Sequence, residues 1–353
     1  YLAMLFLIAG LLSILTDQGR MDRVFVEPFT HFNMTSMFSI NPSLYMGHIL
    51  LCILYLWALF KEKGTLTKIT SLVVVLWAIG THTGTGAIFA LAPRELCLYT
   101  REGEQTMALG AGRLHARTSS GATGFVDLDS GRLRAPTSLD VAAAARLADA
   151  LPHVHGVSTM AAQPADVPVT AVDVHALRIA LANTTKPLGY VCLNEALIEP
   201  VLDMLVVVAG GEQALREKPI ITALTESTSP LQLVSSQWSV LQAFAKRGLP
   251  LTIHAHPMAG FTAPVTLAGE LVVTHAEVLA QTTIAQLTRP GTPVAYGMSS
   301  SVPDMRGGIN LSGAVEIGLL GAAVARMAKR CGLPCVMSTG SDAHAPGAQS
   351  VME

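Results

Sequence analysis

Acidic and imidazole side chains follow several short apolar runs in the second half of this 353-residue sequence. Glu195 and Glu226 each come after such a run, and His254 and His256 close another in the pattern His-x-His. The active sites of α/β barrels lie where strands end and loops begin. The pattern therefore predicts a ligand site where these apolar runs end. Either Glu could instead be only the N-cap of the next helix.

Aromatic side chains that could line such a site are scarce, because only 5% of the residues are Phe, Trp or Tyr. We predict a ligand site built from the few aromatic and charged residues near the ends of the apolar runs. The substrate-binding candidates are Tyr190, Glu195, Glu226, His254, His256, Phe261, Tyr296 and Asp342.

The same imidazoles leave a metal-dependent hydrolase open as an alternative. His254 and His256 at one run, with Asp342 and His344 at another, have the side chains that bind zinc. The two sets belong to different runs and no further ligand is evident, so the prediction is that no metal is bound. Stoichiometric zinc in the purified protein would favour hydrolysis.

The elements that must position these residues form a regular alternation after residue 151. Amphipathic stretches separate the apolar runs, and several end in Lys or Arg with Gly or Pro just after, which is typical of βα units with a parallel sheet. We predict an α/β fold, an incomplete (β/α)8 TIM barrel over residues 138–353, with chemistry at the carboxyl ends of its strands. A doubly wound sheet is the alternative, although no Gly-rich dinucleotide fingerprint follows any run. The predicted strands are 153–160, 187–193, 219–225, 249–254, 293–297 and 333–339, and the predicted helices are 172–181, 197–216, 236–247, 264–287 and 313–330.

A Gly-punctuated region precedes the predicted barrel. Short polar and apolar stretches alternate over residues 94–137, which predicts small β-hairpins. An Ala-rich helix follows and ends before Pro152, with Ser138 as its expected N-cap.

The first 93 residues have a different character. Three runs there lack any formal charge, at 1–16, 44–60 and 69–91. About 20 such residues cross a bilayer as a helix, so we predict an all-α transmembrane segment of about three helices. His82 lies in the third run, where an ionisable group can mark a proton or quinone path or can simply bond a neighbouring helix.

Composition excludes other classes of protein. The formal net charge is −2, so the chain lacks the basic footprint of a nucleic-acid-binding protein. Half of the residues are hydrophobic and 14% are charged, which is too apolar for a disordered chain.

The second half resembles the trimethylamine methyltransferase family over about residues 97–353. A series of punctuated motifs in a fixed order carries this resemblance. These motifs are Asp127-x-x-Ser130-Gly131-Arg132, Asn183-x-x-Lys186-Pro187, Asn194-Glu195, Gly260–Gly269, Arg289–Gly297, Asp304–Gly308 and Ser341-Asp342-Ala343-His344.

The resemblance implies transfer of a methyl group from a methylated amine, such as trimethylamine or glycine betaine, to the cobalt of a corrinoid held by a separate protein. No cofactor would be bound directly by this chain, and this part would lie in the cytoplasm. Founding members of the family carry pyrrolysine, whose position is expected near Ser338, Thr339, Gly340, Ser341 and Asp342. No non-standard residue occurs here, which favours a quaternary amine.

Residues 1–93 resemble the membrane subunits of polysulfide reductase and related quinone oxidoreductases. The resemblance rests on Asp17-x-Gly19-Arg20-x-Asp22-Arg23, on Ser39-Ile40-Asn41-Pro42 and on the segment around His82. It implies a membrane anchor for the chain and, as an alternative function, a quinone-linked oxidoreductase subunit. The two resemblances together indicate a fusion of two incomplete parts.

Overall fold

The computed structural model describes residues 37–61, 63–74, 77, 92–93, 95–122, 124–127, 130–304, 306–307, 309–338 and 340. The chain divides into two compact units, Tyr1–Ala90 and Leu91–Glu353. We describe each unit by itself.

The first unit contains helix α3 (Met37–Phe60) and a second helical stretch over 64–74. Trp77 lies close enough to Gly47 that a Cβ at that glycine would contact its ring. In the part of the chain that the structure describes, no helix is both long and apolar enough to cross a bilayer. The span predicted at 44–60 is therefore not confirmed. The span at 1–16 and most of the span at 69–91 lie outside the described residues.

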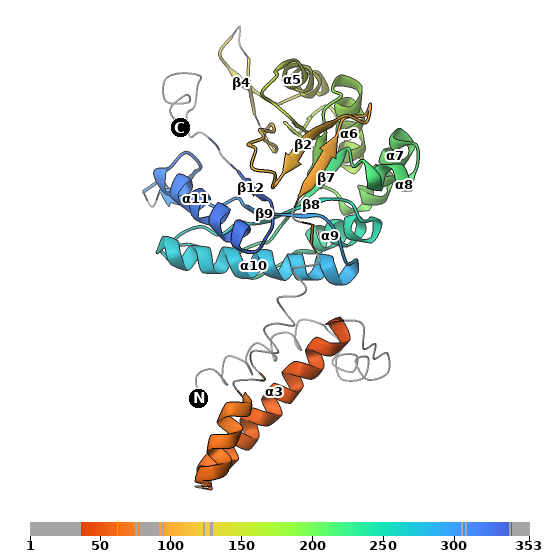
Figure 1. The fold of residues 1–353 in the computed structure, drawn as a ribbon. Helices are drawn as coiled ribbons and strands as arrows, with labels where there is room; N and C mark the ends of the chain where they lie inside the picture. The colour runs from red at the N-terminus through yellow and green to blue at the C-terminus, as the bar shows by residue number, and fades with distance from the viewer. Residues whose placement is uncertain are drawn as a thin grey trace. The chain divides into compact units, whose positions relative to one another are not determined.

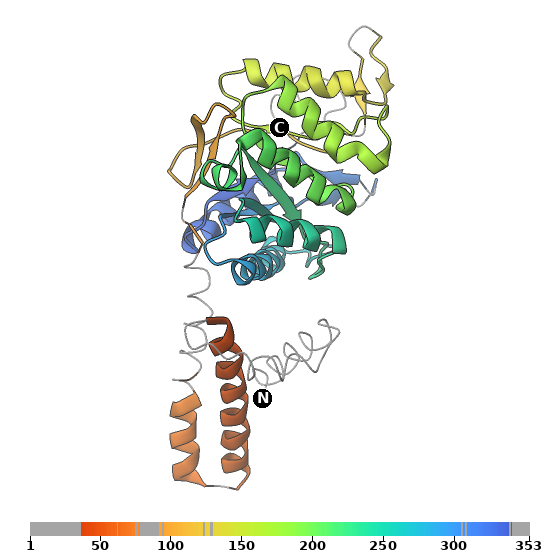
Figure 2. The same ribbon diagram turned by 90° about the vertical axis from the view of Figure 1, so that its right-hand side faces the viewer.

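The second unit is built on a six-stranded parallel sheet in the order β12-β9-β8-β7-β6-β5. The order follows the chain without reversal, which is the winding of a barrel and not of a doubly wound sheet. The curled sheet and its helices fit an incomplete α/β barrel (Figures 1 and 2). Each predicted strand overlaps one observed strand, and β7, β8 and β9 each end one residue later than predicted. The observed strands are β5 (Val157–Ser158), β6 (Leu188–Tyr190), β7 (Ile221–Glu226), β8 (Leu251–Ala255), β9 (Val294–Met298) and β12 (Cys335–Met337).

Helices follow the strands and pack on one face of the sheet. The helices predicted for this region are confirmed within a few residues, except that Gly210 and Gly211 divide the stretch 197–216 in two. The observed helices are α5 (Ser138–Ala150), α6 (Val172–Asn183), α7 (Ile198–Ala209), α8 (Glu212–Glu217), α9 (Ser235–Arg247), α10 (Leu267–Thr288) and α11 (Val315–Arg330).

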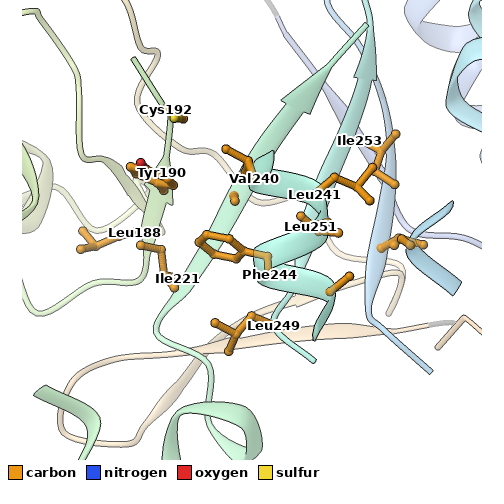
Figure 3. Close-up of a cluster of buried hydrophobic side chains, with 14 of the residues drawn as sticks. Leu188, Tyr190, Cys192, Ile221, Val240, Leu241, Phe244, Leu249, Leu251 and Ile253 are labelled. Carbon is orange, nitrogen blue, oxygen red and sulfur yellow. The ribbon is translucent and has the colours of Figure 1, made fainter. Parts of the chain in front are cut away.

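The main hydrophobic core lies between these helices and the sheet. Alternate strand residues such as Ile221, Leu251 and Ile253 are completely buried there, against Val240 and Phe244 of α9 (Figure 3). Because side chains alternate across a strand, the residues between them face the other side of the sheet, which is the inside of the barrel.

A hairpin fills the amino-terminal end of this interior. It consists of β1 (Leu96–Tyr99) and β2 (Gln105–Leu109), and its Leu96, Leu98 and Met107 pack against Ala295 of β9. The segment 116–122 then runs beside β5, with parallel bridges at Arg117–Gly156 and Ala122–Ala162. The free edge of β5 is thereby covered.

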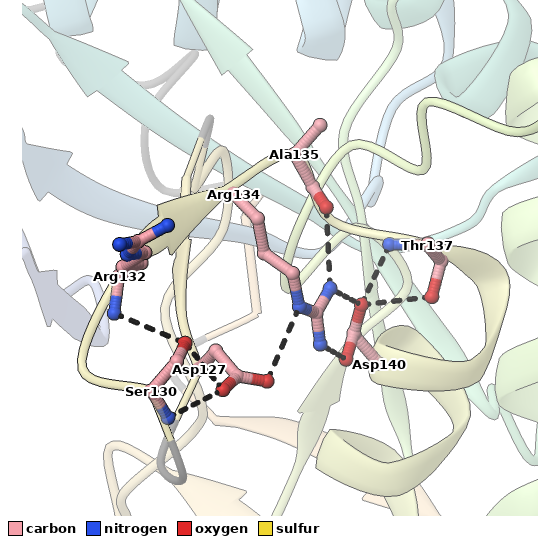
Figure 4. Close-up of polar contacts among 7 residues, drawn as sticks. All are labelled: Asp127, Ser130, Arg132, Arg134, Ala135, Thr137 and Asp140. Carbon is pink, nitrogen blue, oxygen red and sulfur yellow. Dashed lines mark hydrogen bonds and ion pairs between the residues drawn. The ribbon is translucent and has the colours of Figure 1, made fainter.

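A second hairpin is attached to the start of α5. Strands β3 (Phe125–Val126) and β4 (Leu133–Arg134) are antiparallel, and the Arg134 guanidinium forms two 2.7 Å hydrogen bonds with the Asp140 carboxylate. Asp140 also accepts from the backbone N–H and hydroxyl of Thr137 (Figure 4). The N-cap is therefore Thr137 and not Ser138, because the carboxylate three residues into the helix bonds back to it.

Candidate functional site

The candidate site lies at the carboxyl ends of the strands, on the interior face. Glu226 is the last residue of β7 and pairs in register with His254 of β8. Neighbouring residues Thr225 and Ile253 face the other way, so Glu226, His254 and His256 project from the same side of the sheet. Adding Ser299 after β9 and Ser338 after β12, we call these five residues the strand-end cluster.

Glu226 and His256 form an ion pair in which His256 Nδ1 lies 3.5 Å from Glu226 Oε1. Hydrogen bonding to Glu226 raises the pKa of His256, and the charge of Glu277 adds to this effect. Burial raises the pKa of Glu226, but the hydrogen bond and charge of His256 outweigh burial, so the pKa is lowered overall. The Glu226 side chain keeps 27% of its surface exposed. It is thus an ionised carboxylate that a ligand can reach.

His254 is 2% exposed and lies deeper than His256. Its Nδ1 is 2.7 Å from the Ser299 hydroxyl, which is in turn 3.1 Å from the Ser338 hydroxyl. Burial lowers the pKa of His254 to about 4, so the ring is neutral at pH 7. The ring lies over Gly297, where any Cβ would overlap it. Its Nε2 is buried and has no hydrogen-bond partner among the described residues.

A buried carboxylate shapes the loop that follows β7. Glu277 of α10 accepts hydrogen bonds from the hydroxyls of Ser227 and Ser229 and from the backbone N–H of Leu231. Three such bonds offset the cost of burying the charge. Glu277 therefore holds the loop next to the strand-end cluster in one conformation.

Both tyrosines predicted to line the site face the helices instead. Tyr190 donates a 2.9 Å hydrogen bond to Asp173 of α6 and stacks on Phe244. The Tyr296 hydroxyl is 3.0 Å from Nδ1 of His275 in α10. Both tyrosines are nearly completely buried in the main core, on the opposite face of the sheet from the strand-end cluster.

Two further candidates follow β6 and β8 and form no hydrogen bond with the cluster in the described part of the chain. Glu195 begins the short 3-10 helix η2 (Glu195–Leu197) and accepts from the Ser235 hydroxyl at the start of α9. Phe261 is 52% exposed in the loop after β8. Asp342, Ser341, Thr339 and His82 lie outside the described residues.

Among the residues that the structure describes, no group of three or more His, Cys, Asp or Glu side chains is arranged to hold a metal ion. Asp342 and His344, which the zinc alternative needs, fall outside that part of the chain.

Comparison with known proteins gives the chain its family. Residues 80–353 match the family described as trimethylamine methyltransferase (MTTB). The chain belongs to the trimethylamine methyltransferase family. Residues 1–98 match a second family, polysulphide reductase, NrfD. Both resemblances inferred from the sequence motifs are confirmed.

Three curated members of the methyltransferase family are similar to this chain over half of its length or more. Trimethylamine methyltransferase MttB of Desulfitobacterium hafniense is 33% identical over 263 residues, which are 74% of this chain and 53% of that protein. Glycine betaine methyltransferase of the same species is 32% identical over 243 residues, 69% of this chain and 50% of that protein. Trimethylamine methyltransferase MttB1 of Methanosarcina acetivorans is 40% identical over 182 residues, 51% and 37%. The chain spans about half the length of these relatives or less.

Three residues that line the interior were not among the predicted site residues: Arg117, Gly189 and Ser299. A signal existed for Ser299, because a run of three serines directly follows β9. No sequence signal pointed to Arg117, since its position depends on the segment 116–122 pairing with β5.

Proposed function

We propose that the second unit transfers a methyl group from a methylated amine, held at the strand-end cluster, to a corrinoid carried by a separate protein. Membership of the trimethylamine methyltransferase family carries the proposal. Two relatives at 33% and 32% identity are named for trimethylamine and for glycine betaine.

Glu226 is the residue proposed to attract the ammonium group. It is ionised, it remains partly exposed, and its position at the end of β7 is where barrel enzymes bind substrates. The carboxylate would balance the positive nitrogen without taking a proton from it, because a quaternary nitrogen has none.

His256 and the Ser299–His254 pair would fix the surroundings of that charge. His256 holds Glu226 from the side, and Glu277 keeps the adjoining loop in place. The buried His254 stays neutral and adds no repulsion to a bound cation.

The reaction asks little acid–base chemistry of the chain. For a quaternary amine, the C–N bond would break with its electron pair staying on nitrogen, and the product would be a tertiary amine with an uncharged nitrogen. The electron pair for the new bond to the methyl carbon would come from a reduced corrinoid when its carrier protein is bound. The residues of this chain would hold the amine, orient its methyl group and exclude water.

The test is demethylation by the full chain in detergent, with reduced free cobalamin as acceptor and loss of the amine followed by proton NMR. We expect Glu226→Gln to lower the rate at least tenfold, since it removes the charge that balances the cation. Glu199→Gln is the matched control, because Glu199 pairs with Arg247 on exposed surface. No demethylation of trimethylamine or glycine betaine by the wild-type chain would refute the proposal.

A second proposal concerns the first unit, which would anchor the chain in a membrane, with the methyltransferase on the cytoplasmic side. The match of residues 1–98 to the NrfD family supports it. Flotation of the full chain with lipid vesicles, compared with residues 91–353 alone, tests it. Equal flotation of the two proteins would contradict it.

A further inference from the structure

One arginine lies inside the barrel without an acidic partner in the part of the chain that the structure describes. Arg117 belongs to the segment that runs beside β5, and its guanidinium reaches across to Gly189 of β6. A Cβ at Gly189 would overlap the guanidinium, so only glycine leaves room for it there. Leu188 and Tyr190 face the helices, so Gly189 and the arginine head lie on the interior face.

No carboxylate among the described residues balances Arg117. No salt bridge or hydrogen bond joins its guanidinium to any of the described residues, whereas Arg134 and Arg247 both pair with acids. Burial lowers the pKa of Arg117, but the residue is only half-buried, so a ligand can reach its guanidinium. An interior cation without a counter-ion is costly, and such groups in folded proteins are normally paired.

A second unsatisfied donor site lies in the same interior. His254 is 2% exposed and its Nε2 has no partner among the described residues. The Ser299 hydroxyl can donate to Nδ1, which leaves the hydrogen on Nε2. The positive charge of Arg117 is close enough to lower the pKa of His254 further.

We propose that Arg117, together with Nε2 of His254, binds the carboxylate of a zwitterionic betaine whose ammonium group lies toward Glu226. This inference rests on the proposed function and narrows its substrate class. A planar guanidinium matches a carboxylate through two parallel hydrogen bonds.

The charges support a zwitterion over a simple amine. Glu226 supplies one negative group at the strand ends, while Arg117 and the Nε2 of His254 supply donors beside β6 and β8. An unpaired arginine would repel protonated trimethylamine and any other ammonium ligand that carries no carboxylate. A ligand with both charges satisfies both ends of the interior.

The test compares two ligands that share a trimethylammonium group, glycine betaine and tetramethylammonium. Their binding to the full chain in detergent is measured by calorimetric titration. We expect the wild type to bind glycine betaine more tightly. Arg117→Met should lower the affinity for glycine betaine by about 10- to 100-fold, which is the range expected for the loss of a hydrogen bond to a charged group. Tetramethylammonium, which has no carboxylate, should bind the variant as well as the wild type or better.

A second variant keeps the arginine but moves it. In Gly189→Ala the new methyl group displaces the guanidinium. The affinity for glycine betaine should therefore fall again, while the affinity for tetramethylammonium should not. This variant decides the question if Arg117→Met fails to fold, as judged by its circular dichroism.

The proposal would be overturned if the variants lost affinity for both ligands equally, or if they lost no affinity for glycine betaine. Binding of tetramethylammonium without any preference for glycine betaine would overturn it while leaving the proposed methyl transfer intact. Binding of neither ligand by the wild type would count against both proposals.

Discussion

The pair of Glu226 and His256 sets the charge of the strand-end cluster. We expect Glu226→Gln to lower the pKa of His256 toward 6.5 or below, because the hydrogen bond that raises it is weakened and burial remains. Proton NMR titration of the imidazole measures this shift. His275 lies on the other face of the sheet, and burial lowers its pKa. It is the internal control, and its pKa should not change. An unchanged pKa of His256 would contradict the pairing.

Tyr190 tests whether the core tyrosines act on substrate. Tyr190→Phe removes the hydrogen bond to buried Asp173, which should lower the free energy of unfolding by about 1–3 kcal/mol in urea titrations. Glycine betaine affinity should stay the same, because the ring packs among the helices. Tyr296→Phe is the parallel variant, losing the contact with His275. Lost affinity with unchanged stability would restore the prediction made from the sequence.

At the scale of elements, the hairpin β3–β4 and the start of α5 depend on one carboxylate. Asp140→Asn weakens the bonds to Arg134 and Thr137, and loss of a capping interaction costs about 0.5–2 kcal/mol. Thermal unfolding measures the cost. Glu199→Gln, in an exposed ion pair, should change stability by less than about 1 kcal/mol.

The same carboxylate gives a pH signature. The hydrogen bond to Arg134 holds the pKa of Asp140 well below its ordinary 3.8. The stabilisation is therefore present above pH 3.8 and is lost as the pH falls further, toward the folded pKa. The stability difference between wild type and Asp140→Asn should shrink in that acidic range. A difference independent of pH would contradict the ion pair.

Element types were predictable where the local pattern was strong. Six strands and their helices followed from apolar runs and from Gly or Pro after basic helix ends. The hairpin of β10 (Val302–Asp304) and β11 (Ile309–Leu311) was missed, because each strand is three residues long. So short a strand has no periodicity to detect, and cross-strand pairing alone defines it.

At the scale of the whole molecule, the buried His254 couples folding to pH. Burial lowers its pKa to about 4 from an ordinary 6.5, so the unfolded chain binds a proton that the folded chain does not over that range. The free energy of unfolding should therefore fall as the pH drops from about 6.5 to about 4. Urea titrations of wild type and His254→Gln across that range measure it. An identical pH dependence in the two proteins would contradict the assignment.

The sequence by itself determined the order of elements, the family and the strand-end position of Glu226, His254 and His256. Those properties follow from local periodicity and from motifs that are contiguous in the chain. Only the tertiary structure decided which face of the sheet each side chain occupies. Tyr190 and Tyr296 were predicted to line the site, but they lie in the main core. Contacts such as Arg117 over Gly189 join residues 72 positions apart and depend on strand pairing across the sheet, which no local pattern encodes.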